Sequence, residues 1–247
     1  MAFDNTNYQE VEYIQSDAST SQTMRGPYID LGLSGGHYSV IISGCFTKYS
    51  QYAQYIYGYQ ASYASEYIRQ QANANAANVR AEVRGANVTQ NSIAINTDHI
   101  FHLSAFVNNS FLAIDGNTQT MSVTQDFTVG NRYLFAGGTT SGPTGVASFK
   151  MNYCHIYNES DVLVMNLVPC QDRTTLKYGL YDTVGEAFYG TQNAYDFTGG
   201  SPVVSGPKTY VKINGAWTEA SKIYIKVNGA WVEGAMNVKA GGSWKDS

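Results

Sequence analysis

Two acidic residues, Glu159 and Asp161, stand two positions apart, a spacing that places both side chains on one face of a strand. Paired carboxylates that face one groove can hydrolyse a glycosidic bond, one acting as the acid and the other as the nucleophile or base. However, the polar stretch from Asn158 to Asp161 is typical of a turn between two strands, where such side chains are solvated. We therefore predict no catalytic residues and a protein that is not an enzyme.

The histidines offer little for metal or nucleophilic chemistry. His99 and His102 follow Asp98 closely, but three positions along a strand put two imidazoles on opposite faces, where they do not share a metal ion. His37 and His155 are isolated, and no serine–histidine–aspartate arrangement can be assembled from the spacing. We predict no metal site from these residues.

Aromatic residues are concentrated between residues 49 and 67, where tyrosines alternate with glutamines. Tyrosine rings can stack on sugars while hydroxyls and amides bind the sugar oxygens, and a ring loses little rotamer entropy on binding. Three of these rings share one face of a regular strand. The candidate ligand-binding residues are Tyr52, Tyr55, Tyr57, Tyr59 and Tyr63. Two other interpretations remain open, because inward rings would form core and outward rings could pack against a neighbouring subunit.

The composition indicates an all-β protein. Charged residues make up 14% of the chain, against about 25% in an average protein, while 20 of the 247 residues are tyrosine. Residues 1–207 hold no basic cluster, so binding to a nucleic-acid backbone has no electrostatic support. No apolar run reaches the ~18 residues of a membrane span, and the first ten residues do not resemble a secretion signal. We therefore expect synthesis in the cytoplasm, without membrane insertion.

Short alternating segments separated by turn residues fill the first 200 positions. Phe101–Val107 and Phe111–Ile114 read as the two strands of a hairpin, and Asp115-Gly116 turns the chain again. In the segment 149–157, strict alternation puts Met151 on the same face as Tyr153 and opposite to Cys154. No window has the pattern of a long amphipathic helix. These features predict an antiparallel two-sheet sandwich over residues 1–200.

The C-terminal part contains a repeated unit. After a glycine- and proline-rich stretch, which we interpret as a linker at residues 201–207, the segment 210–219 recurs at 224–233 and, in degenerate form, at 238–244. Each copy runs through Asn-Gly or Gly-Gly to a tryptophan, which predicts a tight β-hairpin. Such small hairpins cannot bury their apolar side chains alone, so residues 208–247 are predicted to mediate oligomerisation or attachment. The residues expected to carry this role are Trp217, Trp231, Trp244, Asn214, Gly215, Asn228 and Gly229.

Three parts of the body resemble laminin-G-like jelly-roll domains of the concanavalin A-like lectin/glucanase superfamily. Tyr13-Ile-Gln-Ser16 with Tyr28-Ile-Asp-Leu-Gly32 resembles the opening strands, and Leu112-Ala-Ile-Asp-Gly116 resembles an internal hairpin. The stretch from Phe149 to Tyr189 resembles the closing strands. The resemblance implies an all-β jelly-roll sandwich, here followed by the small C-terminal hairpin region. Such domains occur in phage tail and other surface proteins.

The resemblance also bears on the site. Glucanases of this fold carry Glu-x-Asp-x-x-Glu on one strand, and here Val164 stands in place of the third acid. Some laminin-G-like domains bind calcium at the rim, where Asp115 or Asp126 could serve. However, a turn aspartate that supports its own backbone is favoured, and we predict no cofactor.

The Lys-x-Asn-Gly-x-Trp copies resemble C-terminal repeats of phage tail and fibre proteins. Together the resemblances imply a non-enzymatic virion surface protein of a phage tail, fibre or baseplate. It would bind host cell-surface glycan or protein, contact other virion proteins and form a homo-oligomer, with a trimer favoured. A purely structural head-fibre or decoration protein and a polysaccharide-degrading glycoside hydrolase remain as alternatives, because a fold does not fix a function.

Overall fold

The computed structural model describes residues 3–18, 25–50, 52–60, 64–71, 77–139 and 141–203, together with the backbone of six short strands beyond residue 209. The chain divides into two compact units, Met1–Pro202 and Val203–Ser247, which we call the body and the hairpin region. The predicted linker at residues 201–207 spans this division. Each unit is described by itself.

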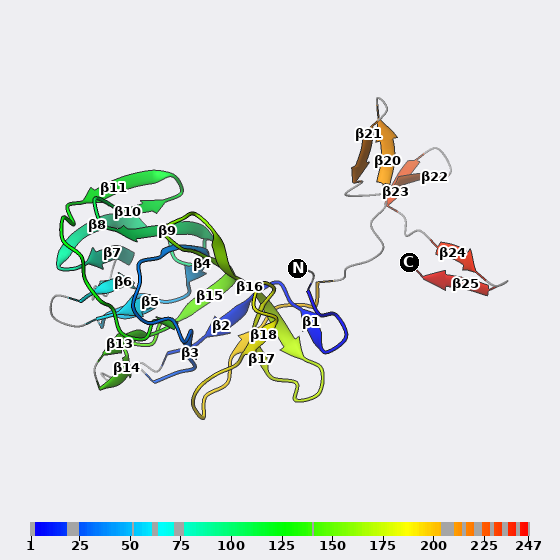
Figure 1. The fold of residues 1–247 in the computed structure, drawn as a ribbon. Helices are drawn as coiled ribbons and strands as arrows, with labels where there is room; N and C mark the ends of the chain where they lie inside the picture. The colour runs from blue at the N-terminus through cyan, green and yellow to red at the C-terminus, as the bar shows by residue number, and fades with distance from the viewer. Residues whose placement is uncertain are drawn as a thin grey trace. The chain divides into compact units, whose positions relative to one another are not determined.

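The larger sheet of the body runs in the order β11-β10-β9-β4-β15-β16-β17-β18, and β1, β2 and β19 pair beside it (Figure 1). Its central strands are long and apolar on one side, which favours burial against a second layer. The strands of this sheet are β1 (Tyr8–Glu10), β2 (Ile14–Ser16), β4 (Ser39–Phe46), β9 (His99–Phe106), β10 (Asn109–Ile114), β11 (Asn117–Met121), β15 (Phe149–Tyr157), β16 (Leu163–Asp172), β17 (Tyr178–Asp182), β18 (Ala187–Tyr189) and β19 (Thr198–Gly199).

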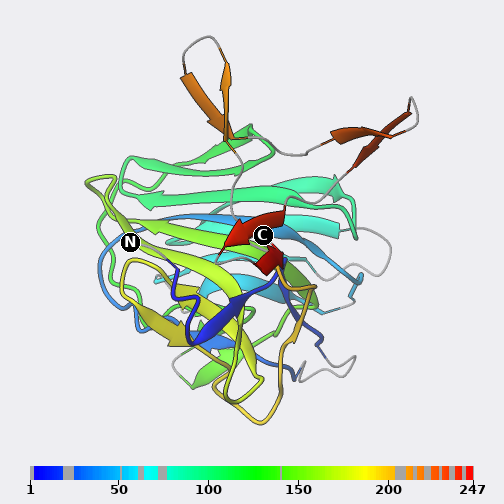
Figure 2. The ribbon, with the colours of Figure 1, turned by 90° about the vertical axis from the view of Figure 1, so that its right-hand side faces the viewer.

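The smaller sheet runs in the order β14-β13-β5-β6-β7-β8, and β12 pairs with both β3 and β5. Figure 2 shows the long strands of the body lying side by side. Apart from β13 against β5, the pairings between the named strands are antiparallel. The strands of this sheet are β3 (Ile29–Asp30), β5 (Gln54–Tyr59), β6 (Glu66–Gln70), β7 (Ala77–Val83), β8 (Ala86–Ile93), β12 (Tyr133–Leu134), β13 (Gly137–Thr139) and β14 (Gly142–Thr144).

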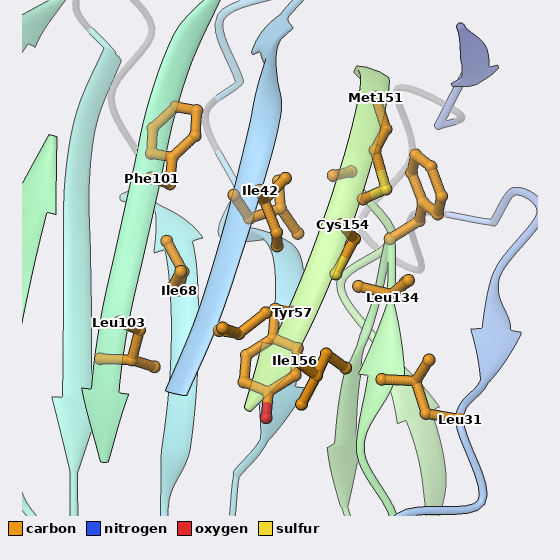
Figure 3. Packing of buried hydrophobic residues seen from close by; sticks show 14 of the residues in the cluster. Leu31, Ile42, Tyr57, Ile68, Phe101, Leu103, Leu134, Met151, Cys154 and Ile156 are labelled. Carbon is orange, nitrogen blue, oxygen red and sulfur yellow. The ribbon is translucent and has the colours of Figure 1, made fainter. Parts of the chain in front are cut away.

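The core lies between the two sheets of the body. Ile42, Phe101 and Ile156 of the larger sheet and Ile68 of the smaller sheet have no exposed surface, and Figure 3 shows their side chains between the layers. Burial of such side chains contributes about 25 cal/mol per Å² of apolar surface removed from water. No helix in the described part of the chain is long and apolar enough to span a membrane. The two sheets and the core between them confirm the predicted all-β sandwich.

A β-bulge in β15 changes which side chains reach the core. The register against β4 shifts between Met151 and Tyr153, so that Asn152 is the extra residue. Met151 thereby joins Cys154 in the core, both with no exposed surface. The predicted alternation is wrong at Met151, because it placed this side chain on the face of Tyr153.

The hairpin region consists of three separate two-stranded sheets. In each hairpin the backbone register pairs a lysine with the tryptophan of the repeat, Lys212 with Trp217 in the first and Lys226 with Trp231 in the second. The predicted tight hairpins are therefore present. Their strands are β20 (Tyr210–Ile213), β21 (Ala216–Glu219), β22 (Tyr224–Val227), β23 (Ala230–Glu233), β24 (Asn237–Ala240) and β25 (Ser243–Asp246).

Candidate functional site

Three neighbouring strands of the larger sheet end at the same rim of the sandwich. Strand β4 begins at Ser39, which pairs with Ser104 near the end of β9 and with Tyr157 at the end of β15. The antiparallel order therefore brings together the segment before β4, the turn after β9 and the turn after β15. The segment between β11 and β12 reaches the same rim through Asp126 and its neighbours.

Two adjoining hollows occupy this rim and share Gly36, His37 and Glu159. Their volumes are about 360 Å³ and about 290 Å³, and we call them together the rim groove. Cavities of ~300–1,000 Å³ with a few convergent polar groups are typical ligand sites. The further lining residues are Tyr38, Val107, Asp126, Phe127, Thr128, Asn158 and Ser160.

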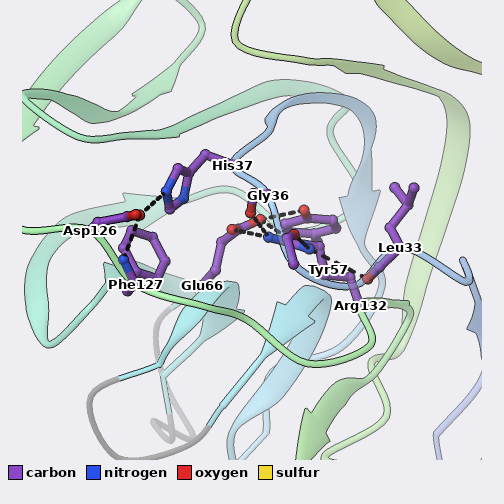
Figure 4. Close-up of polar contacts among 9 residues, drawn as sticks. Leu33, Gly36, His37, Tyr57, Glu66, Asp126, Phe127 and Arg132 are labelled. Atoms are coloured by element: carbon purple, nitrogen blue, oxygen red, sulfur yellow. Dashed lines mark hydrogen bonds and ion pairs between the residues drawn. The ribbon is translucent and has the colours of Figure 1, made fainter.

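One wall of the rim groove is built around His37. Its Nε2 lies 2.7 Å from Oδ1 of Asp126, and the same carboxylate oxygen accepts a hydrogen bond of 2.8 Å from the backbone N–H of Phe127 (Figure 4). The imidazole also packs against the Phe127 ring, with 4.5 Å between the ring centres. His37 is buried, whereas the Asp126 side chain is 88% exposed. The histidine therefore holds a carboxylate in place at the solvent side of the groove.

A buried arginine holds the backbone of Gly36, which lines both hollows and which we call the floor of the rim groove. The Arg132 guanidinium donates hydrogen bonds to the carbonyl oxygens of Gly35 (2.9 Å) and Gly36 (2.8 Å), and a longer one to that of Leu33 (3.4 Å). Gly35 and Gly36 have φ values of 60° and 55°, a conformation that glycine adopts without strain. The Tyr38 ring stands 4.7 Å from the same guanidinium. Arg132 thus fixes the loop that leads to His37.

The charge of Arg132 is balanced inside the core. Its Nε and one terminal nitrogen each donate to an oxygen of Glu66, both at 2.8 Å, and the Tyr57 hydroxyl donates to Glu66 at 2.5 Å (Figure 4). Burial disfavours the charged form of Arg132, but Glu66, Tyr57 and Tyr38 together outweigh this effect, so the pKa of Arg132 lies above its usual value. Burial also raises the pKa of Tyr57, and the Glu66 charge raises it further. Arg132 is therefore charged, and Tyr57 is a neutral hydrogen-bond donor beside it.

The opposite wall is the turn after β15. Oδ1 of Asn158 accepts hydrogen bonds from the backbone N–H groups of Ser160 (3.0 Å) and Val162 (3.1 Å), which is the pattern of a self-supporting polar turn. Glu159, at the tip of this turn, is exposed and lines the rim groove. Asp161 is exposed but is not among the lining residues. Residues 158–161 therefore form the solvated polar turn that the sequence predicts, and the turn does not present both acids to the groove.

The rim groove has the chemistry of a binding site for hydroxyl-rich ligands. The hydrogen bond from His37, and then that from the Phe127 backbone, lower the pKa of Asp126 below its usual value. Asp126 is thus a fixed acceptor, and it lacks the raised pKa that a general acid needs at neutral pH. The carboxylates of Asp126 and Glu159 can accept hydrogen bonds from hydroxyl groups, and the partly exposed Tyr38 ring can contact the apolar face of a sugar.

The predicted tyrosine surface is not assembled by strand β5. Its register against β6 shifts between Tyr55 and Tyr57, so Tyr55 lies opposite Arg69 and Tyr57 opposite Ile68. Because of this bulge, Tyr55 and Tyr57 point to different faces of the smaller sheet. Tyr55, Tyr57 and also Tyr59 are buried, at 3%, 0% and 9% exposure. The expectation that these rings share one face is corrected, and their burial leaves no ring surface for a ligand.

The remaining residues of the predicted sites lie elsewhere. Tyr52 is half-buried and packs against a small cluster that includes Val146. Tyr63 lies outside the described residues, as do the predicted turn residues Asn214, Gly215, Asn228 and Gly229. Trp217, Trp231 and Trp244 occupy positions in β21, β23 and β25.

The histidines of β9 have separate partners. His99 Nδ1 lies 2.6 Å from Asp115, whose other oxygen accepts from the backbone N–H of Ile100 at 2.9 Å. His102 Nε2 lies 2.7 Å from the Ser39 hydroxyl. Among the described residues, no group of three or more His, Cys, Asp or Glu side chains is placed to hold a metal ion.

Sequence reasoning missed most of the rim groove. The pair Gly35-Gly36 immediately before His37 was a usable signal, because two glycines ahead of an aromatic and a histidine indicate a tight backbone approach at a strand start. Asp126 was considered only as a calcium ligand. Nothing in the spacing connects residues 36, 126 and 159, which the antiparallel fold brings to one rim.

Comparisons with known proteins address the fold. No protein-family model matches the sequence, and no curated protein matches it. Among solved structures, the chain is similar to a candidate carbohydrate-binding protein from Bacteroides ovatus, with a TM-score of 0.54, 10% identity and 79% of this chain covered. The chain spans 62% of the length of that protein. A heptameric pentraxin from Limulus polyphemus matches at a TM-score of 0.43 and 10% identity, over 59% of this chain and 76% of its own.

The two antiparallel sheets and the similarity to the Bacteroides protein confirm the predicted jelly-roll sandwich. At 10% identity it shows the fold alone.

Proposed function

We propose that the body is a non-enzymatic carbohydrate-binding module that takes its ligand at the rim groove. The observation that carries this proposal is the groove itself, in which His37 holds the exposed Asp126 carboxylate opposite Glu159. The Arg132 contacts below it keep the floor in place before a ligand arrives, which reduces the entropy cost of binding. The fold likeness to a candidate carbohydrate-binding protein supports the same ligand class.

The two carboxylates give the rim groove a negative character. Neutral sugars with free hydroxyl groups fit it better than acidic sugars, because a carboxylate on the ligand would meet Asp126 and Glu159. A single shallow site of this kind binds sugar weakly, and several copies supply avidity.

Glu159→Ala tests the site directly. Full-length protein is screened against an array of neutral cell-surface oligosaccharides, and each hit is titrated by isothermal calorimetry. We expect Glu159→Ala to weaken binding about tenfold, the effect of losing a hydrogen bond to a charged group. Asp161→Ala is the matched control, since Asp161 is exposed on the same turn but does not line the groove. Equal effects of the two substitutions, or no hit on the array, would refute the proposal.

The absence of catalysis is tested separately. Incubation of the protein with the polysaccharides that it binds should release no reducing ends. Release that disappears in Glu159→Gln or Asp161→Asn would overturn the non-enzyme assignment and favour a glycoside hydrolase.

We further propose that the chain is a phage virion surface protein of tail, fibre or baseplate, with the hairpin region holding copies together or onto the particle. The support is the resemblance of the repeats to those of phage fibres and the three hairpins, each of which pairs with no further strand in the described residues. Isolated hairpins are marginally stable in water, so they need partners. A purely structural decoration protein shares this support but needs no sugar ligand.

Light scattering of the full chain tests the role of the hairpin region. Replacement of Trp217, Trp231 and Trp244 together by alanine should lower the oligomer mass, with a trimer expected for the parent protein. An unchanged mass, or unchanged incorporation into particles, would contradict this role. If the protein bound no sugar on the glycan array but attached stoichiometrically to capsids, the decoration protein would be favoured.

A further inference from the structure

Strand β8 forms an open edge of the smaller sheet (Figure 1). The strand order of the larger sheet ends in β11 and β18, and that of the smaller sheet ends in β14 and β8. The first three of these strands are 5, 3 and 3 residues long, and β14 contains Pro143. Strand β8 is 8 residues long and contains no charged residue and no proline. Because short strands, lysine and proline are the usual means of keeping a sheet edge from pairing, β8 lacks this protection.

The turn before β8 determines which backbone groups face outward. Arg84 and Gly85 have φ values of 49° and 81°, as in a two-residue type I′ turn, and the register joins β7 directly to β8 around them. The residues that flank such a turn form a hydrogen-bonded pair, and hydrogen-bonded and non-hydrogen-bonded pairs then alternate along the two strands. The N–H and C=O groups of Asn87 and Thr89 therefore point away from β7. No further strand in the described part of the chain pairs with them.

Contacts within the body hold this edge in place. The side-chain amide of Gln90 donates to the backbone carbonyl oxygen of Asn117, at the start of β11, at 2.7 Å. At the other end of the strand, the Arg84 guanidinium donates to the side chain of Gln125 at 2.6 Å. A bulge, at which Ser92 has a φ of 61°, is confined to the last part of β8. The first part of β8 is therefore a regular edge strand whose shape is fixed before a partner arrives.

The side chains of β8 suit pairing with an identical strand. Val88 is half-buried and packs against the core, whereas Asn87 is exposed. Two antiparallel copies centred on Val88 place valine opposite valine and Asn87 opposite Thr89, so that apolar groups meet each other and an amide meets a hydroxyl. The outward backbone groups of Asn87 and Thr89 then form the hydrogen-bonded pairs. No like charges meet, because β8 carries no charge.

We propose that β8 pairs with β8 of a second copy of the chain, antiparallel and centred on Val88, so that the smaller sheets of two bodies form one continuous sheet. The unpaired backbone groups require an extended strand as the partner, and the register fits a second copy. Arg84, before β8, contacts Gln125, which adjoins Asp126 of the rim groove. Because the paired strands run in opposite directions, the two rim grooves lie at opposite ends of the pair. The contact is separate from the hairpin region and does not depend on sugar binding.

Cysteine cross-linking of the full-length protein tests the register. Val88→Cys should form a disulfide-linked dimer under mild oxidation, because opposite residues of a non-hydrogen-bonded pair have Cα atoms about 4.5 Å apart. Thr89→Cys is the matched control, since its two copies are diagonal neighbours at roughly 7–8 Å, too far for a disulfide. The parent protein, whose cysteines are buried, should form no covalent dimer. The absence of a dimer in Val88→Cys, or a dimer in Thr89→Cys instead, would overturn the proposal.

A lysine on the edge tests the pairing without a change in the core. Asn87 is exposed, and Asn87→Lys should weaken association at least about tenfold, because a charged edge opposes pairing. Thr144→Lys is the control, since Thr144 is exposed on β14, at the other end of the same sheet. Light scattering of a dilution series should give a lower mean mass for Asn87→Lys and the parent mass for Thr144→Lys. Equal masses for Asn87→Lys and the parent protein would refute the pairing.

One further variant separates this contact from the hairpin region. The combined replacement of Trp217, Trp231 and Trp244 by alanine should leave the disulfide-linked dimer of Val88→Cys in place. Loss of that dimer would assign the association to the hairpin region and overturn the role of β8.

Discussion

Arg132 and Glu66 form a two-pronged ion pair in which both side chains have no exposed surface. The remaining donors of the guanidinium reach carbonyl oxygens of the loop before His37. One residue therefore joins the core of the sandwich to the floor of the rim groove. Such a buried ion pair is costly to desolvate. Removal of one partner leaves the other charge buried and uncompensated, whereas removal of both does not.

Replacement of only one partner of the ion pair should lower the free energy of unfolding strongly. Arg132→Met leaves the Glu66 carboxylate buried without its cation, and we expect a loss of about 3–5 kcal/mol in the free energy of unfolding, measured by chemical denaturation. Replacing both residues, as Arg132→Met with Glu66→Leu, should cost less than the sum of the two single changes. Lys48→Met is the control, since the Lys48–Asp17 pair is half-exposed and should contribute less than about 1 kcal/mol. If the loss in the double replacement equalled the sum of the losses in the two single replacements, the two buried charges would not interact.

Gly58 in β5 cannot accept a side chain. A Cβ there would lie 2.0 Å from the Glu66 carbonyl oxygen, and φ is +123°. Gly142→Ala is a matched control, because Gly142 has φ of +116° but open space around it. We expect Gly142→Ala to cost about 1–3 kcal/mol for the backbone conformation alone. Gly58→Ala should cost several kcal/mol more in the same denaturation assay, and equal losses would refute the crowding argument.

Two half-buried histidines should make stability depend on pH. Burial lowers the pKa of His102, and it lowers that of His155 despite the hydrogen bond with Asn166. Because the folded protein binds these protons less tightly than the unfolded chain, the stabilising contribution is present above the unfolded pKa of 6.5. It is lost as the pH falls through the lower folded values. His102→Gln and His155→Gln should each reduce the loss of stability at low pH. Ring-proton titrations that give pKa values at or above 6.5 for the two histidines would contradict this prediction.

The cysteines should be unreactive in the folded protein. Cys45, Cys154 and Cys170 are free and buried. Burial, with a hydrogen bond to Asp98, raises the pKa of Cys45 to about 11, and burial raises that of Cys170 to about 12. Iodoacetamide near neutral pH should therefore label no thiol before unfolding and all three in denaturant, as counted by mass spectrometry. Rapid labelling of the folded protein would show that the sheets open locally.

Most of the fold follows from residue patterns. The hairpin of β9 and β10 was predicted from its apolar strands, and Asp115-Gly116 turns the chain as expected, with φ values of 50° and 82°. The predicted alternation of side chains fails at two of the β-bulges, at Asn152 in β15 and between Tyr55 and Tyr57 in β5. An extra residue in one strand depends on the partner strand, so the sequence of the bulged strand alone does not reveal it.

The candidate site was harder to predict than the fold. His37, Asp126 and Glu159 come from three segments, and no spacing in the sequence connects one of them with another. Arg132 gave no signal either, because a single arginine between loop residues is usually solvated. Its role depends on Glu66, which is 66 positions away. Pairings of this kind are set by tertiary packing.

Arg132 holds its loop through carbonyl oxygens, which every amino acid possesses. These hydrogen bonds therefore do not depend on the side chain at Ser34, which is exposed between Leu33 and Gly35. Ser34, next to the rim groove in sequence, and the exposed Glu159, which lines it, can be randomised while the scaffold beneath is kept intact. The body is thus suited to directed evolution, in which a library at the rim would be selected for binding to a chosen ligand without redesign of the sandwich.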